Sequence, residues 1–429
     1  MPGYSRGVNI RSLVPKVRLA LLILALGILF SLYLQTFIQD EVFYAGDLGL
    51  KMLQVKGFLD GPRLDLVLPA PAWVKQLWNQ GLYPFKPPFV YHLEGRYYVH
   101  YPFLFPLISA PFYHWFGYRG LYLIPLLSVW VLWMGALLTC RRLGLDAIAQ
   151  AVVLISLIFA SPLTVYSATF WEYAPAVTLA GGGLFLLLPG FQSGLSRTRA
   201  AAAGALIGLS VWFRPELLCL AGLLVLLLPG RLWTGTKFNR RFLVVLAMII
   251  PVALFFGLNV YIYGHPFGLH GRQVMEGLDT WERARTGFSI SDRAINGLLM
   301  TADMGRRLVF YFPLCLAVPL IYLLTRNRAS DTQAPLTRLL GLLSVGLFFS
   351  IPFIVPLGAW DNKQWGPRFL LPLIPLLALL AGLGLGPLRR QSRFRLYFGL
   401  AGLAAALVMG TVVNTYVAAQ KLHADYSGR

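Results

Sequence analysis

Long apolar runs separated by short polar segments run through the whole chain. The first run, 19–38, is preceded by Arg6, Arg11, Lys16 and Arg18, and no small-residue cleavage site follows it. A bilayer core needs about 20 apolar residues for one helical crossing, so each run predicts a transmembrane helix. The further predicted crossings are 119–140, 147–165, 173–190, 200–213, 216–230, 242–262, 307–325, 337–357, 368–387 and 396–418.

These runs predict an all-α integral membrane protein, a single polytopic domain over 1–429 with about eleven transmembrane helices. Two runs, on either side of Arg214-Pro215-Glu216, are short and are predicted to be broken or tilted. The segment 100–117 is apolar, but it is short and contains three prolines. We interpret it as lying in the membrane interface; a crossing there is the alternative and would change the side of the loops that follow.

The polar segments suggest an orientation. Placing the basic clusters inside puts the N-terminus in the cytoplasm of a plasma or inner membrane. Two long extracytoplasmic loops then follow, 39–118 with interfacial helices and 264–306. The chain has 37 Lys+Arg against 17 Asp+Glu, a formal net charge of +20. Because this topology leaves 15 of the 17 acids and all six histidines outside, the basic excess indicates orientation and the outer face is the expected active side.

The composition excludes several classes of protein. The chain is 57% hydrophobic and 13% charged, whereas soluble domains average about 25% charged residues. The basic residues form no groove-reading motif, so nucleic acid is excluded as a partner. The three cysteines, Cys140, Cys219 and Cys315, lie far apart in apolar runs and form no zinc or disulfide pattern.

Acids near the predicted membrane boundary are the candidate catalytic residues. Asp40 and Glu41 follow the first crossing directly, and Glu172 lies between Trp171 and Tyr173 at the outer mouth of the third and fourth crossings. Carboxylates are costly to desolvate at such a boundary, which points to function, and one of them could act as a general base. The alternatives are a solvated helix end for the first pair and an interfacial position for Glu172.

Two arginines are candidate phosphate ligands. Arg214 lies between two short apolar runs, and Arg368 begins the tenth predicted crossing. Arg at the centre of a bilayer costs about 2.5–3.5 kcal/mol, and its planar guanidinium suits phosphate. Simple pairing of Arg214 with Glu216 at a short turn is the alternative.

Histidines complete the set of candidates. His100 and His265, in the two long loops, are candidate substrate-binding residues for the lipid phosphate or sugar. Neither belongs to an HExxH or other ligand spacing. No cofactor is therefore predicted, and the spacing gives a divalent metal no support.

Four of these features together resemble the GT-C superfamily, the polytopic glycosyltransferases that use polyprenyl- or dolichyl-phosphate-linked sugars. They are Asp40-Glu41 after the first crossing, His100-Tyr101-Pro102 at the end of the first loop, Glu172, and the late motif Gly366-Pro367-Arg368-Phe369-Leu370-x-Pro372. The protein O-mannosyltransferase and aminoarabinose lipid A transferase groups are the most similar in pattern. The chain departs from them at Tyr101, where relatives often have a second proline.

The resemblance implies a role for each residue. Asp40 or Glu41 would be the acid that activates the acceptor, and Glu172 would be the second acid. Arg214 would contact the lipid phosphate, and Arg368 would be a second contact to the phosphate or sugar.

The expected function is an inverting transfer of one sugar from a polyprenyl-phosphate-linked donor to an acceptor on the extracytoplasmic face. The expected partners are that donor, membrane lipids, and an acceptor glycan, lipid or protein. Two alternatives remain from the sequence: a membrane transporter or lipid flippase, and an enzyme like the O-antigen ligases or polymerases.

Overall fold

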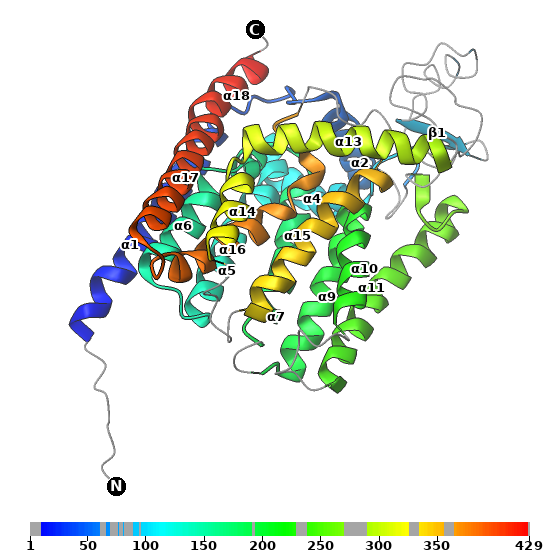
Figure 1. Cartoon of the computed structure of the whole chain (residues 1–429). Coiled ribbons are helices and arrows are strands. Elements are labelled where there is room, and N and C mark those ends of the chain that lie inside the picture. Colours follow the sequence, from blue (N-terminus) through cyan, green and yellow to red (C-terminus); the bar gives the residue numbers. More distant parts are fainter. Residues whose placement is uncertain are drawn as a thin grey trace.

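The computed structural model of the chain is a helical bundle with one small β-hairpin (Figure 1). It describes residues 10–60, 66–68, 76, 80, 89–93, 96–190, 194–228, 238–269, 290–325, 334–355 and 364–427. The first elements are α1 (Ile10–Gln35), α2 (Gly46–Asp60), β1 (Val90–Leu93), β2 (Arg96–Val99), α4 (Leu104–Phe116), η1 (Gly117–Tyr122) and α5 (Leu123–Arg142).

The remaining elements are almost all helical. They are α6 (Ala147–Ile158), η2 (Pro162–Ala168), α7 (Tyr173–Leu187), α9 (Arg197–Phe213), η3 (Pro215–Leu217), α10 (Leu218–Leu227), α11 (Phe238–Tyr263), α13 (Ile290–Tyr311), α14 (Leu314–Thr325), α15 (Ala334–Ile354), η5 (Arg368–Leu370), α16 (Leu373–Leu388), α17 (Arg393–Val412), the π-helical turn η6 (Val413–Val417) and α18 (Ala418–Ser427).

The described residues contain five helical segments that are long and apolar enough to cross a membrane, or up to seven if each of two bent helix pairs is one span. The chain is therefore an integral membrane protein, but the predicted count of about eleven crossings is not confirmed. One reason is length: α7, α10 and α16 have 15, 10 and 16 residues, and a 16-residue helix rises only about 24 Å through a core of about 30 Å.

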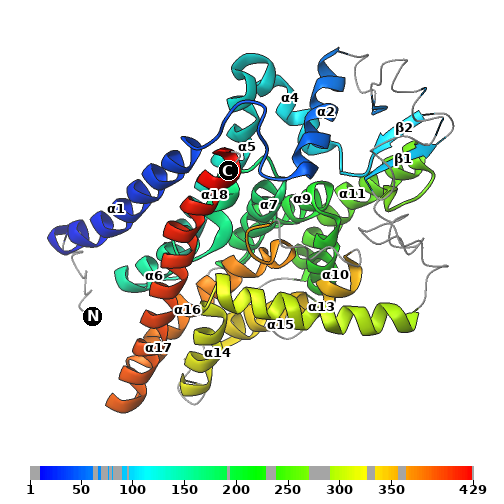
Figure 2. The ribbon, with the colours of Figure 1, turned by 90° about the horizontal axis from the view of Figure 1, so that it is seen from above.

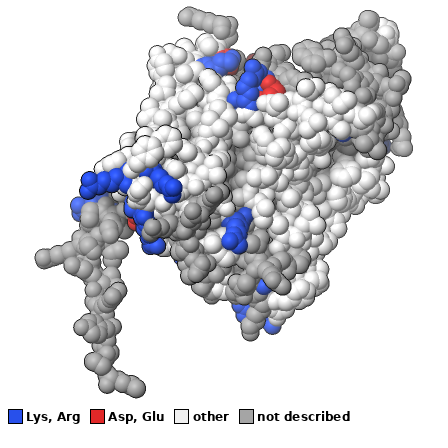
Figure 3. Space-filling view, viewed as in Figure 1, with Lys and Arg blue, Asp and Glu red and all other residues white. Residues whose placement is uncertain are grey.

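Polar residues mark the ends of the bundle. In the space-filling view, charged residues of the described part lie at the upper edge and, mostly as basic residues, along the left edge and in the lower half, and a broad uncharged surface separates the two groups (Figure 3). Helix α13 runs across one end and turns by 89° into α14 (Figure 1). Helix α2, the hairpin and α18 lie at the same end. The candidate site described below is at this end.

The hairpin corrects the prediction of a purely helical fold. Strands β1 and β2 pair antiparallel, with Val90 opposite Val99 and Leu93 opposite Arg96, and an isolated bridge joins Val67 to Tyr98. The aromatic and β-branched residues in both strands favour extended structure. A signal was present in the sequence, because two such runs are separated by only two residues ending in glycine.

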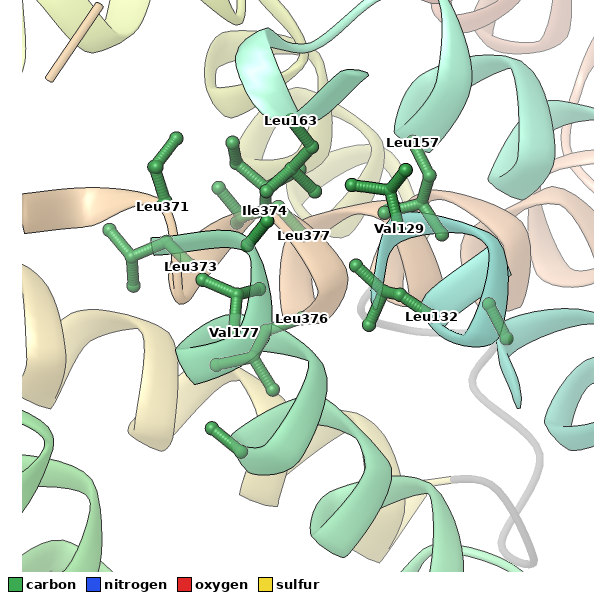
Figure 4. Packing of buried hydrophobic residues seen from close by; sticks show 14 of the residues in the cluster. Val129, Leu132, Leu157, Leu163, Val177, Leu371, Leu373, Ile374, Leu376 and Leu377 are labelled. Atoms are coloured by element: carbon green, nitrogen blue, oxygen red, sulfur yellow. The ribbon is translucent and has the colours of Figure 1, made fainter. Parts of the chain in front are cut away.

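Helix α16 forms the centre of the bundle. Almost all of its side chains are buried, which matches its uninterrupted apolar sequence. Figure 4 shows its residues packed against α5, α7 and the segment that contains Leu163; the residues labelled on α16 and these neighbours include Leu373, Ile374, Leu376, Leu377, Val129, Leu132 and Val177. Arg368, which lies just before α16, is thus attached to the most enclosed helix of the fold.

Two glycines allow α9 to lie directly against α11, which borders the opposite side of the bundle from α1 and α17 (Figure 2). A Cβ at Gly204 would lie 2.1 Å from the Val244 carbonyl oxygen, and one at Gly208 would lie 2.5 Å from that of Met248. Small residues permit this close backbone approach between membrane helices. The packing fixes the end of α9, from which Arg214 projects.

Candidate active site

A buried carboxylate, Glu172, forms the centre of a charged cluster. Glu172 is the N-cap residue of α7 and is 1% exposed. It accepts hydrogen bonds from Lys51 Nζ on α2 and, at 2.9 Å, from Arg214 Nη1 at the end of α9. Burying a charge is costly unless it is paired, and the two cations meet this need.

Arg214 links Glu172 to a second acid. Its Nε donates to Glu216 Oε1 at 2.7 Å, so one guanidinium binds two carboxylates. Helix α9 ends at Phe213 and Arg214 is extended, because Pro215 disfavours a helical conformation in the residue before it. The structure therefore contains the predicted break, and Arg214 is both paired with Glu216 and part of a larger cluster.

Arg368 enters the cluster from the other side. It begins η5, directly after Gly366, whose φ of +75° favours glycine, and Pro367. Its Nη1 lies 3.5 Å from Asp47 Oδ2.

Two aromatic rings hold both arginines. The Arg214 guanidinium carbon lies 4.1 Å from the ring centroid of Tyr173 and 5.1 Å from that of Phe369. The corresponding distances from Arg368 are 6.0 and 4.9 Å. Cation–π attraction of this kind favours guanidinium over a ring face. The two candidate phosphate ligands are therefore brought to the same place although they are far apart in the sequence.

Lys51 is a cluster residue that the sequence interpretation did not select. It is 1% exposed, and its Nζ lies 4.7 Å from the Tyr101 ring centroid. Asp47, Lys51 and Gln54 are spaced i, i+4 and i+7, so they share one face of α2. Gln54 Nε2 donates to the Tyr101 carbonyl oxygen at 3.4 Å. This polar stripe along one face of the segment was the available signal.

Asp40 and Glu41 lie outside this cluster. Both are exposed, in the turn between α1 and α2, and Glu41 has a φ of +66°. Within the described ranges, neither makes an ion pair with a cluster residue. The acid that this loop contributes to the cluster is Asp47, whose side chain is 22% exposed.

The two candidate histidines have different surroundings. His100 lies near the cluster, and burial, reinforced by the charge of Arg214, lowers its pKa to about 4, so it is neutral at pH 7. His265 follows α11, is partly exposed, and accepts a hydrogen bond from the Phe267 amide on Nδ1 at 3.2 Å. It is not in the charged cluster.

Electrostatics keep Glu172 ionised. Burial alone would raise its pKa, but the charges of Lys51 and Arg214 outweigh burial and lower the pKa to about 2. Three cations (Lys51, Arg214 and Arg368) thus meet three acids (Asp47, Glu172 and Glu216). Within the described part of the chain, no group of three or more His, Cys, Asp or Glu is arranged to hold a metal ion.

A buried amide anchors the turn that carries Arg368. Asn414, in the π-helical turn η6, accepts from Trp365 Nε1 at 2.9 Å and donates to the Tyr311 carbonyl oxygen at 2.6 Å. The Trp365 carbonyl oxygen accepts from the Tyr166 hydroxyl at 2.9 Å. Since Trp365 precedes the Gly366-Pro367-Arg368 turn, these bonds fix the start of that turn. Asn414 was not among the residues selected from the sequence.

An open cavity adjoins the cluster. Its walls come from the segment before and at the start of α4, the end of α9, and the end of α11 with the turn that follows it. Tyr101 and Pro215, which neighbour cluster residues, line it together with His100, Trp212, Asn259 and Tyr263.

The comparisons with known proteins concern the fold. No protein-family model and no curated protein matches the chain. Among solved structures, it is similar to ArnT from Cupriavidus metallidurans bound to undecaprenyl phosphate, with a TM-score of 0.50 and 15% identity over 98% of this chain and 76% of that one. It is also similar to the apo oligosaccharyltransferase of Archaeoglobus fulgidus, with a TM-score of 0.50 and 12% identity over 93% of this chain.

This chain spans 56% of the length of the oligosaccharyltransferase. ArnT and the oligosaccharyltransferase are both GT-C glycosyltransferases. The chain therefore shares the fold of these two structures, which agrees with the sequence resemblance.

Proposed function

We propose that this protein is a membrane glycosyltransferase that moves a sugar from a polyprenyl-phosphate-linked donor to an acceptor on the extracytoplasmic face. The observation that carries the proposal is the pairing of Arg214 and Arg368 over the rings of Tyr173 and Phe369, beside three acids, in a GT-C fold. That ArnT was solved with undecaprenyl phosphate supports a lipid of this class. The GT-C fold favours this function over the transporter and flippase alternatives.

The phosphate of the donor is assigned chiefly to Arg368. Arg214 is already bonded to two carboxylates at 2.7 and 2.9 Å, whereas the contact of Arg368 with Asp47 is 3.5 Å long. A phosphate oxygen that takes the place of this longer Asp47 contact leaves both shorter ion pairs of Arg214 intact. Arg214 then adds positive charge next to the site. Fixed guanidinium groups stabilise the charge that grows on the leaving phosphate, and one such donor is typically worth about 10²–10³ in rate.

Asp47 is assigned as the base that activates the acceptor. It belongs to the cluster and is partly exposed, so an acceptor hydroxyl can approach it. Asp40 and Glu41, which the resemblance implied for this role, are outside the cluster. When the acceptor oxygen attacks the anomeric carbon, the bond from that carbon to the phosphate oxygen breaks and the acceptor proton passes to Asp47. Attack from the face opposite the phosphate inverts the anomeric centre, and general-base help is worth about 10²–10⁴.

Glu172 is assigned a supporting role. Both of its oxygens accept hydrogen bonds from cations, one from Lys51 and one from Arg214, and its pKa is about 2. Such a weakly basic, fully paired carboxylate is poorly suited to take a proton. It is well suited to fix the guanidinium of Arg214 beside the phosphate.

The function is tested in cells that lack the gene and are complemented with single variants. Mass spectrometry of lipid-linked sugars and envelope glycans would compare wild type, Asp47→Asn and Asp40→Asn. We expect the deletion to accumulate a polyprenyl-phosphate sugar and to lose one glycan modification. Wild type and Asp40→Asn should restore the modification, whereas Asp47→Asn should not. If Asp47→Asn restores the modification and Asp40→Asn does not, Asp40 is the base instead of Asp47. If deletion of the gene changes no lipid-linked sugar and no glycan, the protein is not a glycosyltransferase of this kind.

A further inference from the structure

A cavity lies beside the charged cluster. It shares a wall with the cluster at two points. Trp212 and Pro215, which both line the cavity, lie two residues before and one residue after Arg214. Tyr101, another lining residue, lies beneath the ammonium of Lys51. The cavity therefore borders the segments that carry Arg214 and the Tyr101 ring of the cluster.

The cavity contains a buried amide with unused hydrogen-bonding capacity. Asn259, on the otherwise apolar helix α11, is 8% exposed and lines the cavity. Among the described residues its carboxamide makes no hydrogen bond, and its polar atoms are not fully enclosed but belong to the wall of the open cavity. Polar residues inside membrane helices mark substrate sites. The amide is thus placed to bind a ligand.

The turn after α11 packs closely against this amide at Gly268. Gly268 has a φ of +59°, and a Cβ at this position would lie 2.7 Å from Asn259 Oδ1. Any other L-residue would therefore be strained and would also press on the carboxamide. The remaining walls are largely aromatic. Trp212 is held by a hydrogen bond of 2.8 Å from its Nε1 to the Pro251 carbonyl oxygen and by an edge contact with Phe255.

This combination fits a sugar ring. A pyranose has apolar C–H faces, which can lie against rings such as Trp212 and Phe255, and hydroxyl groups, which can bond to an amide. An isoprenoid chain would match the rings but would leave the Asn259 amide unsatisfied. Ligand pockets combine apolar walls with a few well-placed polar groups.

We infer that this cavity binds the sugar of the lipid-linked donor, with Asn259 as the residue that bonds its hydroxyl groups. The inference rests on the proposed function, because the phosphate at Arg368 and Arg214 places the sugar. It identifies Asn259 as a specificity-determining residue for the sugar, while the arginines bind the phosphate common to all such lipids.

The test compares lipids with and without a sugar. Binding of undecaprenyl phosphate and of its glucose, mannose and aminoarabinose derivatives would be measured on the purified full-length protein by native mass spectrometry. The variants are Asn259→Leu and Gly268→Ala. The control is Thr301→Val, which removes a polar group of equal exposure, 8%, from α13. Thermal unfolding of each variant is recorded in parallel.

We expect at least one sugar-bearing lipid to bind about tenfold more tightly than undecaprenyl phosphate, the effect of roughly one hydrogen-bonded group. Asn259→Leu and Gly268→Ala should abolish that difference and should leave the affinity for undecaprenyl phosphate within about twofold of wild type. Thr301→Val should change neither affinity. Since Leu replaces an unsatisfied amide, Asn259→Leu should unfold at the same or a higher temperature than wild type.

Two outcomes separate the inference from the proposed function. If undecaprenyl phosphate binds but no sugar derivative binds more tightly, or if Asn259→Leu weakens both kinds of lipid equally, the sugar site is refuted. If the wild-type protein binds none of these lipids, the proposed function itself fails.

Discussion

Replacing Lys51 with methionine should destabilise the protein through Glu172. Lys51 and Glu172 are each 1% exposed, so the substitution leaves a buried carboxylate with Arg214 as its remaining cation. Removing one partner of a buried ion pair typically costs about 3–5 kcal/mol. The lowered pKa of Glu172 agrees in direction, because the charges of Lys51 and Arg214 outweigh burial and favour the ionised form. We therefore expect a loss of about 3 kcal/mol.

The assay is chemical unfolding in mixed micelles at pH 7, followed by tryptophan fluorescence. Two further variants make the result specific. The double variant Lys51→Met/Glu172→Gln removes the stranded charge and should recover at least half of the loss. Lys421→Met breaks the pair with Asp425, in which the lysine is 47% exposed, and an exposed pair contributes less than about 1 kcal/mol. Equal losses in Lys51→Met and Lys421→Met, or no recovery in the double variant, would refute the reasoning.

Three other predictions follow from the site. Arg368→Gln should weaken undecaprenyl phosphate binding at least about tenfold, since a bidentate charge-assisted contact is lost; unchanged affinity in native mass spectrometry would exclude Arg368 as the phosphate ligand. Asn414→Leu removes the anchor of Trp365 and should reduce the affinity for undecaprenyl phosphate more than Thr415→Val, a neighbouring substitution on the same π-helical turn; equal effects would contradict a positioning role. The folded pKa of Glu172, about 2, is below its ordinary 4.5, so its contribution is present above about pH 4.5 and is lost as the pH falls toward 2. Wild-type unfolding free energy should therefore drop more across this interval than that of Glu172→Gln, and parallel pH curves would contradict the pairing.

The sequence was sufficient for a mainly helical membrane fold, though not for its crossing count or its hairpin, and for three members of the cluster. Glu172, Arg214 and Arg368 could each be selected from the sequence alone, because placing a charged side chain beside an apolar run costs free energy and therefore points to function. The break at Pro215 followed from local stereochemistry. What the sequence could not reveal is that these residues, from three distant segments, meet around the same pair of rings.

The missed residues depend on long-range packing. Lys51 lies in a segment that could equally cover the membrane surface, and only its burial against Glu172, 121 positions away, assigns it to the site. The choice between Asp40 and Asp47 depends on the turn between α1 and α2, which exposes the first and directs the second to Arg368. The number of crossings was also hard to predict, because α7, α10 and α16 are apolar along their length but are short helices.

The most direct test of the central claim is turnover with the natural lipid fraction. Lipid-linked sugars extracted from cells that lack the gene would be incubated with purified protein, and release of the free polyprenyl phosphate would be followed by mass spectrometry. We predict release by wild type and by Asp40→Asn, and a rate lower by about 10²–10⁴ for Asp47→Asn. Absence of release by the wild-type protein, with its acceptor supplied as a membrane extract, would contradict the assignment as a polyprenyl-phosphate-dependent glycosyltransferase.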